Sequence, residues 1–135
     1  MTKMRILIVD DEPLARERVR ALLSAETDVE IIGECGNGPD AVAAIRQDRP
    51  DIVFLDMQMP GADGLQVVRE LPADDRPAIV FVTAHDRFAI DAFGVHATDY
   101  LLKPFDQDRF RSALKRASDH VRAKRLGELN ARVET

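Results

Sequence analysis

The sequence predicts an α/β fold in which helices cover both faces of a doubly wound parallel sheet. Short apolar runs of the kind that form buried strands recur five times along the 135 residues. Each run is followed by a segment whose apolar residues are spaced as in a helix, and strands that alternate with helices pair in parallel. Because such crossovers are right-handed, five units favour the strand order 2-1-3-4-5.

The strands are expected where apolar residues lie between turn-forming residues. Gly33 is expected to end the second strand, and residues 36–39 (Gly-Asn-Gly-Pro) to form the turn that follows. Strands one and three are neighbours in the predicted order, so their carboxyl ends should meet near the centre of one edge of the sheet. The expected strand ranges are 6–9, 29–32, 52–55, 78–82 and 100–102.

The helices are expected in the segments that follow the strands, because apolar residues recur there three or four positions apart. Pro13 suits the first turn of the first helix, the second helix must end before Pro50, and the third before Pro72. Gly94 is expected to end the fourth helix, and Asp106 can cap the fifth. The positions that define the five helices are Ala15, Val19, Leu22 and Leu23; Ala41, Val42 and Ile45; Leu65, Val68 and Leu71; Phe88, Ala89, Ala92 and Phe93; and Phe110, Leu114, Ala117 and Val121.

The composition is that of an ordinary soluble domain, with 45% hydrophobic and 32% charged residues. The length suits one domain with a core of its own. The net charge of −5 does not favour binding to nucleic acid or to an acidic membrane, and no apolar run approaches the ~20 residues of a membrane span. The single cysteine, Cys35, excludes an internal disulfide and is typical of a reducing cytoplasm, the expected location.

Acidic residues follow two strands that are predicted to be neighbours. Asp10 and Asp11 follow the first strand, and Asp56 follows the third. Carboxylates crowded at one edge of a sheet repel each other unless a cation neutralises them, and oxygen ligands suit Mg²⁺. An aspartate can also act as a nucleophile and form an aspartyl-phosphate. Alone, Asp56 could equally cap a turn or a helix, and an acid pair such as Asp10 and Asp11 usually favours the start of a helix electrostatically. Only their joint placement indicates a site.

The fourth and fifth strands end in groups that can bind phosphate. Thr83 and Ala84 follow the fourth strand and offer a hydroxyl and a backbone N–H. Lys103 follows the fifth strand and provides a mobile positive charge. A threonine at a strand end is usually structural and a lone lysine is usually solvated, so here too only the combination indicates a site. Pro104 permits a cis peptide bond after Lys103, because cis bonds are largely confined to proline.

With these residues in this order, the chain resembles the receiver domain of bacterial two-component response regulators, which has a flavodoxin-like (βα)5 fold. The resemblance covers residues 4–121, and its segments are specific in combination although none is specific alone. They are Val9-Asp10-Asp11-Glu12, Asp56-x-x-Met59-Pro60-x-x-x-Gly64, Val82-Thr83-Ala84 and Lys103-Pro104-Phe105.

The resemblance implies that Asp56 is the phosphoacceptor, which takes a phosphoryl group from the phosphohistidine of a sensor histidine kinase or from a small phosphodonor. Asp11 is then the main carboxylate ligand of Mg²⁺, and Asp10 assists it. Asp56 itself and the backbone carbonyl of Gln58 complete the protein ligands of the metal. A receiver is not an enzyme beyond catalysing its own phosphorylation and dephosphorylation.

The resemblance also implies how the phosphoryl group is held and sensed. Lys103, Thr83 and Ala84 bind its oxygens, and the bond between Lys103 and Pro104 is cis. Thr83 moves toward the phosphoryl group, and Tyr100 follows by changing its rotamer. The surface formed by the fourth helix, the fifth strand and the fifth helix then changes, which we expect to control a phosphorylation-dependent homodimer.

A narrower resemblance lies in residues 83–93 and 99–105, which are similar to receivers of the LytTR (LytR/AlgR) subfamily. His85 departs from it, because many of these receivers have tyrosine there. In receivers the positions of Gln58 and His85 flank the path of the attacking water, so these residues would tune the lifetime of the phosphate. His85 could instead be a metal ligand or a general base, and a solvated loop histidine is the favoured interpretation. LytTR receivers usually precede a DNA-binding domain that regulates transcription, and the sequence contains none. We expect a receiver cut from a longer protein, and a stand-alone receiver that acts through protein–protein contacts is the alternative.

Two regions are therefore expected, a receiver over residues 1–121 and a helical extension or linker over residues 122–135. Leu126, Leu129 and Val133 continue the apolar pattern of the fifth helix but out of phase by one residue. A heptad coiled coil holds its phase, so the pattern favours a linker over a dimerising coil. DNA would be reached only through an output domain outside this chain.

Three other classes of function share part of this chemistry. A phosphohydrolase of the haloacid dehalogenase type also uses an aspartate nucleophile, Mg²⁺ and a lysine, but its signature separates two aspartates by one residue, whereas Asp10 and Asp11 are adjacent. An FMN-binding protein needs a phosphate loop after the first strand, where the acids at 10–12 would repel phosphate. A receiver that serves only for docking is disfavoured by the complete set of acids and by Lys103.

Overall fold

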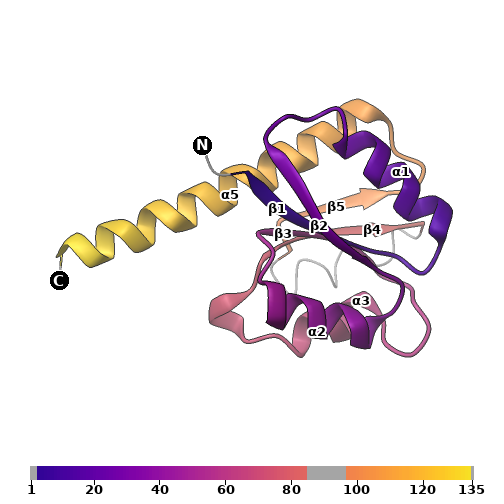
Figure 1. Cartoon of the computed structure of the whole chain (residues 1–135), viewed down its shortest axis with the longest axis horizontal. Helices are drawn as coiled ribbons and strands as arrows, with labels where there is room; N and C mark the ends of the chain where they lie inside the picture. Colours follow the sequence, from indigo (N-terminus) through magenta and orange to yellow (C-terminus); the bar gives the residue numbers. More distant parts are fainter. Residues whose placement is uncertain (1–2, 85–96, 135) are drawn as a thin grey trace.

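The computed structural model describes residues 3–84 and 97–134 and shows one five-stranded sheet in these segments. Neighbouring strands all pair in parallel in the order β2-β1-β3-β4-β5, which confirms the predicted topology (Figure 1). Because β1 and β3 are paired, their carboxyl ends lie side by side. The strands are β1 Met4–Val9, β2 Val29–Cys35, β3 Ile52–Asp56, β4 Ala78–Thr83 and β5 Asp99–Leu102.

Helices lie on both faces of the sheet, with α1 and α5 on one face and α2 and α3 on the other (Figure 1). A short 3-10 helix at Ala73–Asp75 was not predicted. The predicted fourth helix, from Phe88 to Phe93 with its end at Gly94, lies outside the described residues. The helices are α1 Pro13–Leu23, α2 Gly38–Asp48, α3 Gly64–Arg69 and α5 Gln107–Glu134.

Two apolar layers form because successive side chains of a strand point to opposite faces. In β1, Ile6 and Ile8 pack with the buried residues of α1 and α5, whereas Leu7 and Val9 pack with those of α2 and α3. A slip of one residue would exchange these faces. Burial of the strands therefore fixes which residues reach the carboxyl edge of the sheet.

The end of β2 and the start of α2 differ from the prediction for a physical reason. Gly33 does not end β2, because the ladder with β1 continues until Val9 pairs with Cys35. The predicted turn at residues 36–39 is too long, because the side chain of Asn37 accepts a hydrogen bond of 2.8 Å from the backbone N–H three residues later and caps α2. The second half of that segment is therefore the first turn of α2.

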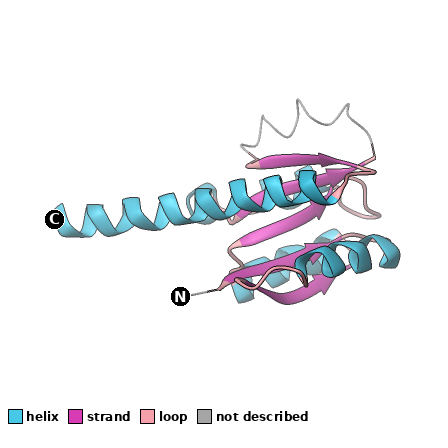
Figure 2. Ribbon diagram, turned by 90° about the horizontal axis from the view of Figure 1, so that it is seen from above, coloured by secondary structure: helices cyan, strands magenta, loops and turns pink. Residues whose placement is uncertain are grey.

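α5 runs for 28 residues without interruption and extends well beyond the sheet (Figure 2). Asp106 caps it as predicted, by accepting a hydrogen bond of 2.7 Å from the backbone N–H three residues later. Its buried positions end at Val121 and residues 122–131 are exposed, although Arg125 still donates to the carboxylate of Asp51, just before β3. In the part of the chain described here, no helix combines the length and the apolar character needed to cross a membrane.

Candidate functional site

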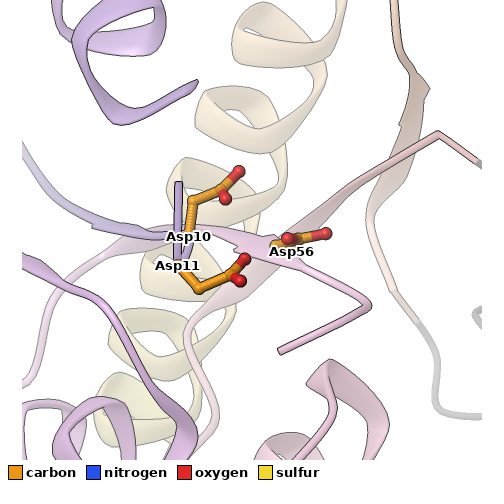
Figure 3. A group of neighbouring side chains, drawn as sticks. All are labelled: Asp10, Asp11 and Asp56. Atoms are coloured by element: carbon orange, nitrogen blue, oxygen red, sulfur yellow. The ribbon is translucent and has the colours of Figure 1, made fainter. Parts of the chain in front are cut away.

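The carboxylates of Asp10, Asp11 and Asp56 meet at the edge of the sheet where β1 and β3 end (Figure 3). Asp10 and Asp11 follow β1 directly, and Asp56 is the last residue of β3. One oxygen from each carboxylate can be chosen so that all three atoms lie within 4.8 Å of one another. The fold thus brings together the three acids that the sequence predicted to cluster.

Asp56 lies where a negative charge is unfavourable. Only 5% of the surface of Asp56 is exposed to solvent. Burial, followed by repulsion from Asp10, raises the pKa of Asp56 to about 7. One hydrogen bond opposes the rise, in which the backbone N–H of Gln58 donates to Asp56 Oδ1 at 3.2 Å. A cation that neutralises this carboxylate would therefore be bound favourably.

Lys103 is brought to the acids by the loop after β5. Its Nζ donates to Asp10 Oδ2 at 3.0 Å, and its backbone N–H donates to the carbonyl of Thr83 at 2.7 Å. The peptide bond between Lys103 and Pro104 is cis, which confirms the expectation from the resemblance. Burial lowers the pKa of Lys103, but the hydrogen bond to Asp10 and the nearby negative charges outweigh burial, so the pKa is raised. Lys103 therefore remains a cation beside the acids.

Of the remaining predicted residues, Thr83 and Ala84 lie at the same edge. Thr83 ends β4 and is buried, and Ala84 follows it at the surface. Tyr100 is half-buried in β5 and packs against the core under α2 and α3. His85 lies outside the described residues. A cavity of about 660 Å³ opens here, and the predicted residues that line it are Asp10, Asp11, Asp56, Gln58, Ala84 and Lys103.

The donor set fits a hard divalent cation. The three acids offer only oxygen, which suits Mg²⁺, and Asp11 is more exposed than the two buried acids. The cluster therefore faces solvent on one side, as a cation that keeps several of its waters requires. When all are ionised, the acids and Lys103 leave an excess of negative charge for a divalent cation to balance.

Gly64 supports the site in a way that sequence reasoning did not identify, although it belongs to the motif that begins at Asp56. It opens α3, and its N–H donates to the carbonyl of Met57 at 3.0 Å. A Cβ at this position would lie 2.6 Å from the carbonyl oxygen of Asp56 and 3.2 Å from Cα of Met57. Real Cβ atoms do not approach backbone so closely, so glycine is required where α3 passes the end of β3. Only the tertiary contact reveals this.

Comparison with known sequences identifies relatives of this chain. The profile of the response regulator receiver domain matches residues 6–115. The transcriptional regulatory protein BtsR of Salmonella typhi is 52% identical over 113 residues, which are 84% of this chain and 47% of that protein. An uncharacterized response regulatory protein of Shewanella oneidensis is 53% identical over 110 residues, which are 82% of this chain and 47% of that protein. The chain thus spans about half the length of these curated relatives.

Solved structures share its fold. The response regulatory domain of mrkE from Klebsiella pneumoniae aligns with a TM-score of 0.82 and 30% identity, over 89% of this chain and 99% of that one. The signal receiver domain of NarL from Mycobacterium tuberculosis aligns with a TM-score of 0.79 and 32% identity, over 87% and 98% of the two chains. The strand order, the profile match and these relatives agree, and the chain belongs to the response regulator receiver domain family, with its flavodoxin-like fold.

Proposed function

We propose that this receiver accepts a phosphoryl group on Asp56 from the phosphohistidine of a sensor histidine kinase, in a reaction that requires Mg²⁺. The observation that carries the proposal is the acidic cluster of Asp10, Asp11 and Asp56 with Lys103 bonded to it. This arrangement supplies a nucleophile, a place for a divalent cation and a fixed positive charge within one cavity. Family membership supports the same chemistry.

The transfer forms one bond and breaks one. A carboxylate oxygen of Asp56 attacks phosphorus, an O–P bond forms, and the P–N bond to the histidine of the kinase breaks while the imidazole leaves. Lys103, the hydroxyl of Thr83 and the N–H of Ala84 would bind the phosphoryl oxygens. Asp10, Asp11, Asp56 and the backbone carbonyl of Gln58 would hold Mg²⁺, which when bound screens the charges of the two anionic reactants.

The phosphoryl group would also leave within the same cavity. Attack of water on phosphorus restores the Asp56 carboxylate and releases inorganic phosphate, so the domain would catalyse both its own phosphorylation and its dephosphorylation. Gln58 is exposed beside the cluster. We propose that Gln58 and His85 set how readily water attacks, and hence the lifetime of the phosphorylated form.

Thr83 and Tyr100 would carry the change from the site to a distant surface. Thr83 ends β4, and Tyr100 lies on the adjacent strand, where it pairs with Phe81. A phosphoryl group adds charge and acceptor oxygens that draw Thr83 toward it, and Tyr100 then takes another rotamer. The surface of β5 and α5, completed by the predicted helix within residues 85–96, would then favour a homodimer.

The expected output is control of transcription. BtsR carries the name of a transcriptional regulatory protein and is about twice as long as this chain. We propose that residues 1–121 form the receiver, that residues 122–135 form the helical extension, and that a DNA-binding domain of the LytTR type completes the cytoplasmic regulator. DNA would be contacted through that domain and not through the receiver.

The intact mass of the protein tests this proposal. The protein is incubated with Mg²⁺ and acetyl phosphate, a small phosphodonor, beside the variant Asp56→Asn. We expect the mass of one phosphoryl group to be added to the parent only, and a chelator to abolish the addition. An unchanged mass with acetyl phosphate and with a purified phosphohistidine donor, or an equal gain in Asp56→Asn, would contradict it.

A further inference from the structure

Two hydrogen bonds fix the backbone on both sides of Asp10. Its N–H donates to the carbonyl of Cys35 at 3.0 Å, and its carbonyl accepts a hydrogen bond of 2.6 Å from Nη1 of Arg16. That carbonyl belongs to the planar peptide group that joins Asp10 to Asp11. Because the two carboxylates leave the chain from opposite ends of this group, its orientation determines where both of them point.

Arg16 is itself held in place by β2. Its Nε lies 3.5 Å from Oε1 of Glu34, the residue before Cys35. The end of β2 therefore supports the N–H of Asp10 directly and the carbonyl through Arg16. The side chains of Arg16 and Glu34 are 22% and 24% exposed, which is unusual burial for a pair of charged residues with no part in the apolar core.

Glu34 is also bound by a second arginine on the same helix. Arg20 donates to both of its carboxylate oxygens, at 2.7 and 2.8 Å. These hydrogen bonds lower the pKa of Glu34 in spite of its partial burial. Glu34 thus compensates the positive charge of Arg16, so that the guanidinium can bind a carbonyl beside the acidic cluster while the acids keep their charge for a cation.

We propose that Arg16, supported by Glu34, is a positioning residue of the acidic site, which fixes the peptide group between Asp10 and Asp11 so that their carboxylates face a cation together with Asp56. The identity of the cation rests on the proposed function above. The orientation of the peptide group does not depend on a bound cation and can be tested without one.

Arg16→Met and Arg20→Met form a matched pair for the test. Each removes one guanidinium from α1 that contacts Glu34, but only Arg16 reaches Asp10. Mg²⁺ is titrated into the ¹⁵N-labelled full chain, the dissociation constant is read from amide shifts, and unfolding is measured separately in EDTA. We expect Arg16→Met to raise the dissociation constant about tenfold, as loss of a supporting hydrogen bond does at metal sites, and Arg20→Met to leave it nearly unchanged.

A second readout needs no metal. In EDTA, the amide resonances of Asp11 and Glu12 should shift in Arg16→Met and keep their parental positions in Arg20→Met. Equal effects of the two variants, on affinity or on these resonances, would overturn the proposal. Arg16→Gln and Arg20→Gln take their place, with the same expected order, in case Arg16→Met does not fold. A parent that binds no Mg²⁺ would refute the proposed function, whereas the resonances in EDTA would still decide whether Arg16 orients the peptide group.

Discussion

Asp56 is an acid whose charge the fold makes costly, and the cost can be measured. In Asp56→Asn the buried charge and its repulsion with Asp10 are removed. We expect the variant to be more stable than the parent by about 1–2 kcal/mol at pH 8 in EDTA, a figure that allows for solvent screening. Urea unfolding measures the difference. Asp74→Asn, which removes an exposed acid from the 3-10 helix, is the control and should change stability little; an equal gain there would refute the explanation.

Replacing glycine by alanine should have opposite effects on stability at Gly64 and at Gly127. In Gly64→Ala the new methyl group would meet the carbonyl oxygen of Asp56 at 2.6 Å, whereas nothing lies within 4 Å of a methyl group at Gly127 in α5. We expect Gly64→Ala to lose about 2–3 kcal/mol of stability because the site is overpacked. Gly127→Ala should gain about 0.5–1 kcal/mol because alanine favours helix. Thermal unfolding of both variants checks the signs, and a stable Gly64→Ala would contradict the packing described here.

The sequence predicted that candidate residues at the ends of strands would cluster, but it did not identify residues whose roles depend on tertiary contacts. Asp10, Asp56 and Lys103 could be predicted because each stands directly after an apolar run, and strand order alone then brings them together. Gly64 and Arg16 could not, because their roles depend on how closely α3 approaches β3 and on which carbonyl lies beside α1. No residue spacing encodes either distance.

Between elements, one ion pair joins β5 to the start of α5. Arg109 donates to both oxygens of Asp99, at 2.8 and 3.1 Å, and to the carbonyl of Tyr100 at 2.7 Å. Burial alone would raise the pKa of Asp99, but the hydrogen bonds from Arg109 and from the Tyr100 N–H outweigh it and hold the pKa below its ordinary value. The native state therefore binds its proton less readily than the unfolded chain does.

This pair predicts a definite pH dependence. Its contribution to stability should be complete above about pH 4 and should be lost as the pH falls through the lowered pKa of Asp99. We expect Arg109→Met to lower the free energy of unfolding by about 2 kcal/mol at pH 7, a figure that allows for solvent screening because the Arg109 side chain is 41% exposed. Below pH 4 the difference in stability between the variant and the parent should become smaller. Urea unfolding between pH 3 and pH 7 measures it. Lys115→Met, which breaks an exposed pair with Asp119, should show no such trend; a loss in Arg109→Met that is independent of pH would refute the assignment.

Element boundaries were predictable to the extent that side chains determine them. The apolar spacing in α5 located Phe110, Leu114, Ala117 and Val121, all of which are buried. The end of β2 was misjudged because a backbone ladder continued past Gly33, and the start of α2 because Asn37 was counted as part of a turn and not as a cap. The backbone ladder that sets the end of β2 is not recorded in a side-chain pattern, whereas the cap that sets the start of α2 is a side-chain signal that also occurs in turns.

At the scale of the whole molecule, binding of Mg²⁺ should make the folded chain more stable. A ligand that binds only the folded chain raises the free energy of unfolding by about 2.7 kcal/mol at one hundred times its dissociation constant. We expect thermal unfolding of the parent to shift upward with Mg²⁺ at constant ionic strength, and the shift to be greatly reduced in Asp11→Asn. Equal shifts in the two proteins would place the ion elsewhere.

The overall topology was the most predictable feature, because alternation of strands and helices admits few right-handed arrangements. The course of the chain beyond Val121 was less so. The sequence left open a helical extension or a linker there. An unbroken run of exposed residues begins at 122, and the helix continues through Glu134. Helical backbone hydrogen bonds do not need a buried face to persist from one turn to the next.

Because α5 is long, a small rotation at its start would displace its far end by several ångströms. It starts three residues after Pro104, beside the acidic cavity, and its 28 residues make it about 42 Å long. If the helix pivots as a rigid rod by about 5° at its first turn, its far end sweeps roughly 4 Å, since displacement grows in proportion to distance from the pivot. The hydrogen bond from Arg125 to Asp51, partway along the helix, would oppose such a rotation. The exposed end of the helix would move about twice as far as Val121, where its buried face ends, because Val121 lies about halfway along the helix.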